Sequence, residues 1–158
     1  MFLESFDKYH SLVDFDQFQE TQPVIGILST EVFGPSMKTN TFPFEQFTWE
    51  TNVNFVHYAG SWAVPIRWDI TDEELYPLLD SINGVFFAGG GSKLIDRDTG
   101  ELSQLYELSV KIFEYTKWSK DVEGVDFPIL GICQGFEIIH YLANRDDKST
   151  LSNVRIFG

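Results

Sequence analysis

The fold of this chain is decided by the stretch Pro128-Ile129-Leu130-Gly131-Ile132-Cys133-Gln134-Gly135-Phe136-Glu137. Its apolar first half predicts a short buried strand, and its second half predicts a helix that begins directly after a sharp turn. Between them lies a Gly-x-Cys-x-Gly sequence, the layout of a nucleophile elbow with cysteine in the place of serine. Cys133 is the one cysteine among 158 residues, so the sequence offers a single nucleophile candidate. A single cysteine also excludes an internal disulfide framework and a cysteine zinc site.

Strands and helices alternate along the rest of the chain, which predicts an α/β fold: a three-layer sandwich with a mostly parallel sheet and helices on both faces. We expect strands at 24–28, 62–68, 85–88 and 127–132, and helices at 44–58, 71–82, 98–113 and 133–144. Thr71 and Glu74 form a capping box for the second helix. Pro77 should kink or shorten that helix, and Gly60 should end the first one. Residues 29–43 are predicted to form a loop, and 154–157 a weak strand.

A second glycine-rich segment, Gly89-Gly90-Gly91, follows the third predicted strand. Parallel sheets bind ligands at the carboxyl ends of their strands, and consecutive strands are often neighbours. We therefore expect this glycine loop to face Cys133. The positive end of the helix dipole favours a thiolate at Cys133. The backbone N–H of Gln134 and an N–H near Gly90 or Gly91 would then form an oxyanion hole. The alternative is a buried structural cysteine whose glycines serve only helix–strand packing.

Composition limits the classes of partner. The chain has 24 Asp plus Glu against 11 Lys plus Arg, a formal net charge of −13, so nucleic acid and anionic membrane surfaces should repel it. No apolar run approaches the roughly 20 residues that a membrane-spanning helix needs. Residues 1–22 form an acidic, aromatic arm without the basic start and apolar stretch of a secretory signal. We expect residues 23–158 to form one domain, without nucleic acid or membrane as a partner.

Four segments together resemble the γ-glutamyl hydrolases, a branch of the class I glutamine amidotransferase-like superfamily. They are residues 22–28, residues 54–66, Ser81-Ile82-Asn83-Gly84-Val85-Phe86-Phe87-Ala88-Gly89-Gly90, and residues 127–137. The resemblance covers about residues 22–144. Ala88 departs from it, because proline or threonine is usual there. Glu137 separates the branches, since the amidotransferases usually have Gln at this place and the hydrolases have Glu. A surface or capping carboxylate is the alternative interpretation of Glu137.

The resemblance implies a flavodoxin-like, class I glutamine amidotransferase-like fold and a cysteine ω-peptidase that cuts γ-glutamyl bonds, as in folyl polyglutamates. Cys133 would be the nucleophile, and the N–H groups of Gln134 and Gly90 would bind the oxyanion. Gly89, Gly91 and Glu137 would contact the γ-glutamyl substrate, which is a small molecule or peptide. No metal or organic cofactor is implied. The family is commonly lysosomal, vacuolar or secreted, although this chain shows no signal peptide.

The departure that matters most concerns histidine. The family's catalytic histidine lies in a later His-Pro-Glu type motif, and none of the three histidines here precedes proline. We expect His10, His57 and His140 not to act as the base, and the fold to be incomplete at its C-terminal end with an open, apolar sheet edge. The histidine would come from the chain's own C-terminal half or from another subunit in a homodimer or larger assembly.

Three other functions stay open at this point. The first is a catalytically inactive structural or interaction protein built on this fold. Its support is the missing histidine, the aromatic arm and the tryptophans, of which Trp49, Trp62 and Trp118 could anchor contacts. An amidotransferase-type glutaminase half is disfavoured by Glu137. A stress-type cysteine hydrolase with a Cys–Glu pair lacks an identifiable partner glutamate.

Overall fold

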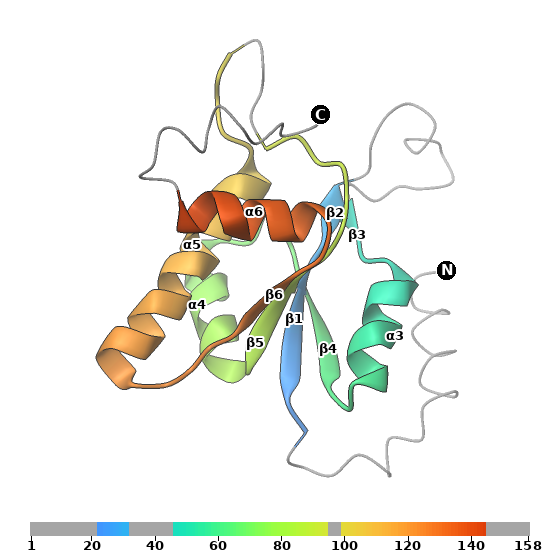
Figure 1. The fold of residues 1–158 in the computed structure, drawn as a ribbon, viewed down its shortest axis with the longest axis vertical. Helices are drawn as coiled ribbons and strands as arrows, with labels where there is room; N and C mark the ends of the chain where they lie inside the picture. The colour runs from blue at the N-terminus through green and yellow to red at the C-terminus, as the bar shows by residue number, and fades with distance from the viewer. Residues whose placement is uncertain (1–21, 32–45, 95–98, 145–158) are drawn as a thin grey trace.

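The computed structural model describes residues 22–31, 46–94 and 99–144 (Figure 1). The strands are β1 (Val24–Leu28), β2 (Thr30–Glu31), β3 (Gln46–Phe47), β4 (Trp62–Ile66), β5 (Gly84–Phe87) and β6 (Ile129–Gly131). The helices are α3 (Glu50–Tyr58), α4 (Asp72–Ser81), α5 (Gln104–Trp118) and α6 (Gln134–Ala143), and a π-helical turn (Ser119–Glu123) follows α5.

Four of the strands form one parallel sheet in the order β4-β1-β5-β6. The register places Ile27 beside Phe86 and Phe87 beside Gly131. β1 is central because the chain crosses first to β4 and then back past β1 to β5, so strand order reverses beside β1. Ligands in such sheets bind at the carboxyl ends of the strands near this reversal. The sheet confirms the predicted α/β class.

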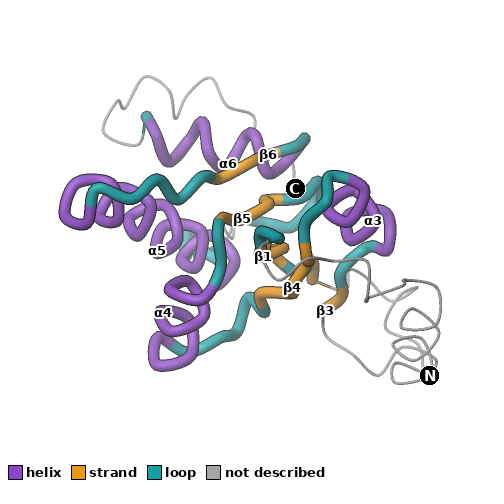
Figure 2. The backbone as a smooth tube through the Cα atoms, turned by 90° about the horizontal axis from the view of Figure 1, so that it is seen from below, coloured by secondary structure: helices purple, strands orange, loops and turns teal. Residues whose placement is uncertain are grey.

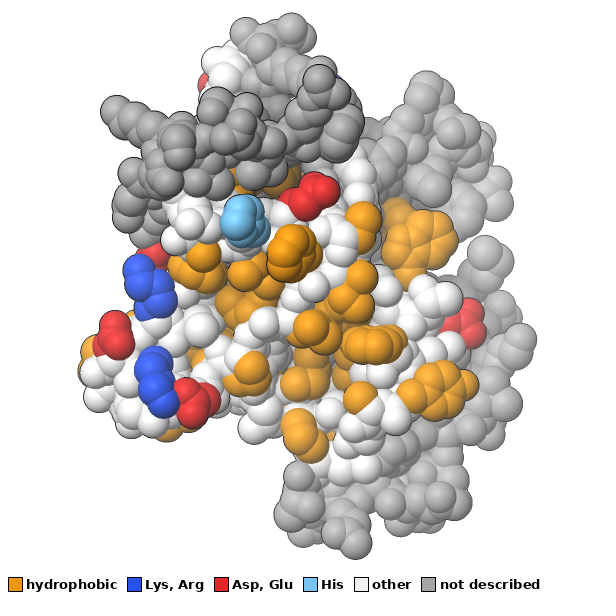
Figure 3. Space-filling view, in the orientation of Figure 1, with side chains coloured by type: hydrophobic (Ala, Val, Ile, Leu, Met, Phe, Trp, Pro, Cys, Tyr) orange, Lys and Arg blue, Asp and Glu red, His pale blue; other side chains and the backbone are white. Residues whose placement is uncertain are grey.

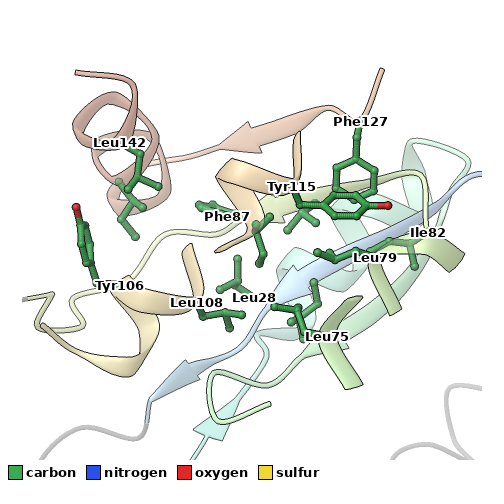
Figure 4. Close-up of a cluster of buried hydrophobic side chains, with 14 of the residues drawn as sticks. Leu28, Leu75, Leu79, Ile82, Phe87, Tyr106, Leu108, Tyr115, Phe127 and Leu142 are labelled. Carbon is green, nitrogen blue, oxygen red and sulfur yellow. The ribbon is translucent and has the colours of Figure 1, made fainter. Parts of the chain in front are cut away.

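Helices cover both faces of the sheet, as Figure 2 shows end-on. The larger core lies under α4, α5 and α6, and Figure 4 shows part of it. Its fully buried members include Ile66, Leu75, Leu79, Ile112 and Phe87. The smaller core lies under α3, where Val56 packs with Ile27 and Phe86. Neighbouring residues of a strand point to opposite faces, so Phe86 and Phe87 contribute to different cores.

Local sequence signals explain where several elements begin and end. Thr71 and Glu74 form the predicted capping box at the start of α4. The Ser103 hydroxyl caps α5 by accepting a hydrogen bond from the backbone N–H of Tyr106 at 3.2 Å. Gly60 follows α3 with φ +80°, a conformation that glycine adopts without steric cost. Helix α4 continues four residues beyond Pro77 to Ser81.

Several predicted boundaries were wrong. The helix expected from residue 44 begins at Glu50, because Gln46 and Phe47 pair with β2 instead. Side-chain contacts hold this segment extended: Gln46 Oε1 accepts hydrogen bonds from the Ser29 hydroxyl and from the Trp68 N–H. The predicted loop from residue 29 therefore contains β2.

Further boundaries shift by one to six residues: α5 ends at Trp118 and not at 113, and β5 spans Gly84–Phe87 and not 85–88. Helix α5 begins at Gln104, after its Ser103 cap, and not at 98–101. Strand β4 ends at Ile66, and β6 covers only Ile129–Gly131. The predicted arm, apart from Gln22, and the weak strand at 154–157 lie outside the described residues.

Strand β6 forms one edge of the sheet within the described residues. Its neighbourhood carries apolar side chains in solvent: Leu130 is 48% exposed, Ile132 44% and Phe136 63%. Leu130 lies beside Phe86 in the register and shares its face, but only α3 covers that face among the described elements. Figure 3 shows hydrophobic side chains gathered across the middle of this side of the molecule.

Candidate active site

Cys133 sits on a sharp turn between β6 and α6. Its φ of 55° and ψ of −118° make it the one described residue other than glycine with positive φ. Such a conformation costs roughly 1–3 kcal/mol and persists only where neighbouring contacts enforce it. Here the Ile132 N–H donates to the Phe87 carbonyl at 3.1 Å and the Glu137 N–H donates to the Cys133 carbonyl at 3.1 Å. Cys133 is exposed, so the alternative of a buried structural cysteine does not hold.

The two glycines of the elbow have no room for a side chain. A Cβ on Gly135 would lie 1.8 Å from the Phe87 carbonyl oxygen, and one on Gly131 would lie 2.7 Å from the Gly135 carbonyl. Helix α6 therefore starts in direct backbone contact with the ends of β5 and β6. This close approach fixes where the helix begins and holds Cys133 at the carboxyl edge of the sheet.

The glycine loop after β5 faces the elbow, as the sequence predicts. A Cβ on Gly89 would lie 3.2 Å from Cys133 Cβ and 3.8 Å from its Sγ. A Cβ on Gly90 would lie 2.9 Å from Gln134 Oε1, whereas Gly91 has open space around it. The structure thus brings Gly89 and Gly90 to Cys133 and Gln134, and leaves Gly91 on the solvent side of the loop.

The Gln134 side chain joins the two loops. Its Nε2 donates to the Ser92 carbonyl at 2.6 Å, and its Oε1 accepts from the Ser92 N–H at 3.0 Å. Gln134 is 6% exposed and Ser92 2%. The sequence indicated a role only for the backbone N–H of Gln134, and this side-chain contact was not predicted. A buried carboxamide needs a partner, but this partner lies 42 residues away in the chain, so the sequence did not identify it.

A small cavity lies behind the glycine loop, at the carboxyl ends of β1 and β5. Several of its lining residues carry polar side chains: Ser29, Thr30, Ser92, Ser109 and Gln134. Apolar walls come from Leu28, Phe87, Leu105 and Ile138. The cavity therefore lies under the loop and not at the thiol.

Glu137 and His140 lie on α6, and His57 lies on α3. Glu137 is half-buried one turn into α6. His140 is exposed and stacks on Phe136, and seven residues along a helix place it roughly 10 Å down the axis from Cys133. His57 lies on α3 with its ring edge-on to Trp62, and burial lowers its pKa. His10 lies outside the described residues. Neither described histidine is placed to act as a base for Cys133.

An ion pair stands at the same edge of the sheet, after β4. Arg67 donates two hydrogen bonds to the Asp69 carboxylate, and Gln46 Nε2 donates a third at 2.6 Å. Arg67, and then Gln46, hold the pKa of Asp69 below its ordinary value.

In the part of the chain that the structure describes, no group of three or more His, Cys, Asp or Glu could hold a metal ion. None of the described helices is long and apolar enough to cross a membrane.

An exposed cysteine with positive φ thus stands at the start of a helix and faces a glycine loop at the carboxyl edge of a parallel α/β sheet. The family model described as Peptidase C26 matches residues 23–143, and the chain belongs to this family.

Curated relatives agree with this assignment. The chain is 35% identical over 133 residues to the gamma-glutamyl hydrolase of Rattus norvegicus, covering 84% of this chain and 38% of that protein. It is 33% identical over 133 residues to the gamma-glutamyl hydrolase of Bos taurus, again covering 84% of this chain and 38% of that protein. Gamma-glutamyl hydrolase 1 of Arabidopsis thaliana is 32% identical over 127 residues, 79% of this chain and 34% of that one. The chain therefore spans somewhat more than a third of the length of these relatives.

Proposed function

We infer that this chain carries the nucleophile-bearing part of a γ-glutamyl hydrolase, a cysteine ω-peptidase that cleaves γ-glutamyl bonds of folyl poly-γ-glutamates. The observation that carries the proposal is the exposed Cys133 at positive φ, with Gly89 against its side chain. The substrate class comes from the relatives, which are named gamma-glutamyl hydrolases.

In the proposed reaction, the Cys133 thiolate attacks the carbonyl carbon of the γ-amide. The carbonyl oxygen becomes an oxyanion, which accepts hydrogen bonds from the backbone N–H groups of Gln134 and Gly90. Collapse breaks the C–N bond, the amine leaves with a proton from a general acid, and a thioester on Cys133 remains. Water then attacks the thioester, which releases the acid and restores the thiol. The base is an imidazole from outside the described residues.

The remaining site residues would bind substrate. Gly91 has open space around it and leaves room for an extended γ-glutamyl chain to pass the loop. Gly89 packs against Cys133 and lets the backbone approach the scissile amide closely. Glu137, half-buried one turn into α6, would accept hydrogen bonds from amide N–H groups of the substrate.

The test uses the full natural protein with pteroyl-tri-γ-glutamate and, as the matched control, the isomer with α-linked glutamates. We expect release of glutamate or γ-linked diglutamate from the γ-linked substrate alone. Cys133→Ala should abolish this release while leaving the thermal unfolding transition in place. Cleavage that persists in Cys133→Ala, or equal cleavage of both isomers, would contradict the proposed function.

A non-catalytic interaction role is the second candidate, and the exposed apolar residues beside β6 favour it. Leu130, Ile132 and Phe136 are all more than two-fifths exposed. Alkylation of Cys133 by iodoacetamide in the native assembly separates the two functions. Rapid alkylation together with γ-glutamyl cleavage supports the hydrolase, whereas a tight assembly that protects Cys133 and cleaves nothing supports the interaction role.

A further inference from the structure

The carboxamide of Gln134 makes a two-point contact with the backbone of one residue, Ser92. One hydrogen bond runs in each direction, from Gln134 Nε2 to the Ser92 carbonyl and from the Ser92 N–H to Gln134 Oε1. Both residues are almost fully buried, at 6% and 2% exposure. The two hydrogen bonds fix both the distance of Ser92 from the Gln134 carboxamide and the orientation of the Ser92 backbone. A single hydrogen bond would still allow the loop to rotate.

The segment that this contact holds has few other restraints. Residues 88–93 belong to no helix or strand, and three of the six are glycines without side chains to pack. Gly90 and Gly91 are exposed, and nothing lies within 4 Å of the position of a Gly91 Cβ. Gly90 in turn rests against Gln134 Oε1, which a Cβ would approach to 2.9 Å. The carboxamide thus contacts the loop both at Gly90 and two residues further on.

The geometry therefore gives Gln134 two separate tasks. Its backbone N–H stands at the first position of α6, where intrahelical acceptors are absent, and is free to serve an oxyanion. Its side chain holds the loop that carries the second proposed donor, the Gly90 N–H. The spacing between the two donors depends on one residue, and an oxyanion hole requires both donors about 2.7–3.1 Å from the developing charge.

We propose that the Gln134 side chain is a positioning residue, which locks the glycine loop at the distance from Cys133 that an oxyanion requires. This deepens the proposed function and rests on it for the identity of the acyl substrate. The lock itself rests only on the contacts with Ser92 and Gly90. Replacing Gln134 by leucine leaves the Ser92 N–H and carbonyl without partners in a buried place, so the loop must move to hydrate them.

The first measurement is amide hydrogen exchange of the full chain, for Gln134→Leu and Gln134→Glu. Glutamate keeps an acceptor for the Ser92 N–H and loses the donor to the Ser92 carbonyl. The matched control is Gln104→Leu, the same change at an exposed position of α5. We expect exchange in the segment 88–93 to rise at least tenfold in Gln134→Leu and less in Gln134→Glu, with no change in the control. Wild-type exchange in this segment in both Gln134 variants would overturn the proposal.

The second measurement compares two reactions of Cys133. Acylation by a simple thioester, acetyl thiocholine, passes through an oxyanion, whereas alkylation by iodoacetamide does not. We expect Gln134→Leu to slow acylation at least tenfold and to change alkylation less than twofold, since the loss of one oxyanion donor typically costs ~10²–10³ in rate. A purely structural role would slow both reactions together, which would overturn the positioning role. Acetyl transfer needs no γ-glutamyl group. The acylation rates therefore test the positioning role of Gln134 even if the γ-glutamyl substrate assignment is wrong.

Discussion

Gly135→Ala is the sharpest perturbation of the elbow that the structure offers. The new methyl carbon would lie 1.8 Å from the Phe87 carbonyl oxygen, 2.5 Å from its carbonyl carbon and 2.8 Å from Phe87 Cβ. Two of these atoms are backbone, in a strand that pairs on both sides, so they cannot rotate away. To reach even 3.0 Å from the oxygen, α6 must retreat from β5 by about 1.2 Å.

The cost of this retreat exceeds the gain from alanine. Alanine in a helix is favoured over glycine by about 1 kcal/mol. Overpacking of a close-packed site costs typically 1–3 kcal/mol, and this contact belongs at the upper end because rigid backbone is on one side. We therefore expect a net loss of about 2 kcal/mol or more in the free energy of unfolding, equivalent to roughly 4–8 °C in Tm for a domain of this size. A displacement near 1 Å at the nucleophile should also slow acylation about 10²-fold.

Urea unfolding of both proteins measures the loss of stability, and thioester acylation followed by mass spectrometry measures the rate. Gly91→Ala is the control for stability alone, because it adds the same methyl group where nothing lies within 4 Å. It should change the free energy of unfolding by less than about 0.5 kcal/mol, as surface substitutions do. If Gly135→Ala is as stable as wild type and acylates as fast, the close contact of α6 with β5 is wrong.

Three further predictions concern the hydrophobic core, the loss of stability at alkaline pH and the role of His140. Leu79→Ala, at a fully buried position of α4, should cost about 2–5 kcal/mol in the free energy of urea unfolding, against under about 0.5 kcal/mol for Leu102→Ala at a half-exposed position; equal losses would contradict the core assignment. Burial, and then the hydrogen bond to Asp80, raise the pKa of Tyr115 to about 12 from 10.0. The folded state keeps the phenol protonated longer than the unfolded state does, so this contribution to stability is complete below pH 10 and is lost between pH 10 and 12. Tyr115→Phe should flatten the fall of Tm over this window, and an unchanged fall would show that other groups set the limit. His140→Ala should leave the acylation rate of Cys133 within twofold of wild type, and a tenfold drop would place the imidazole at the site.

The strand–helix order and the sharp turn at Cys133 were predictable because they depend on local signals. Glycines on either side of Cys133 indicated a sharp turn, and the apolar run before it indicated a strand. The expected burial of this strand was wrong, because Leu130 is 48% exposed at the edge of the sheet. Val24–Leu28 was predicted to the residue, and the glycine loop was correctly placed against Cys133 because consecutive strands are neighbours here. The capping box of Thr71 and Glu74 fixed the start of α4 in the same way.

Two of the failures share one cause, which is contact between residues far apart in the chain. Phe47 has helical spacing with Phe55, yet pairing with β2 and the contacts of Gln46 keep this segment extended. The Gln134 contact with Ser92 joins positions 42 residues apart, so no local pattern predicts it. Only the packing of β5 beside β6 brings these two residues together.

The most direct test of the account is the site of acylation by an N-acylated γ-glutamyl thioester. Its thiolate leaves without needing a proton, so the reaction depends on the nucleophile and the oxyanion hole and not on a base. We expect one acyl group per chain, located on Cys133 by peptide mapping, and no adduct with the corresponding α-glutamyl thioester or in Cys133→Ala. An unmodified Cys133, or an adduct on another residue, would contradict the claim that this cysteine is the nucleophile of a γ-glutamyl hydrolase.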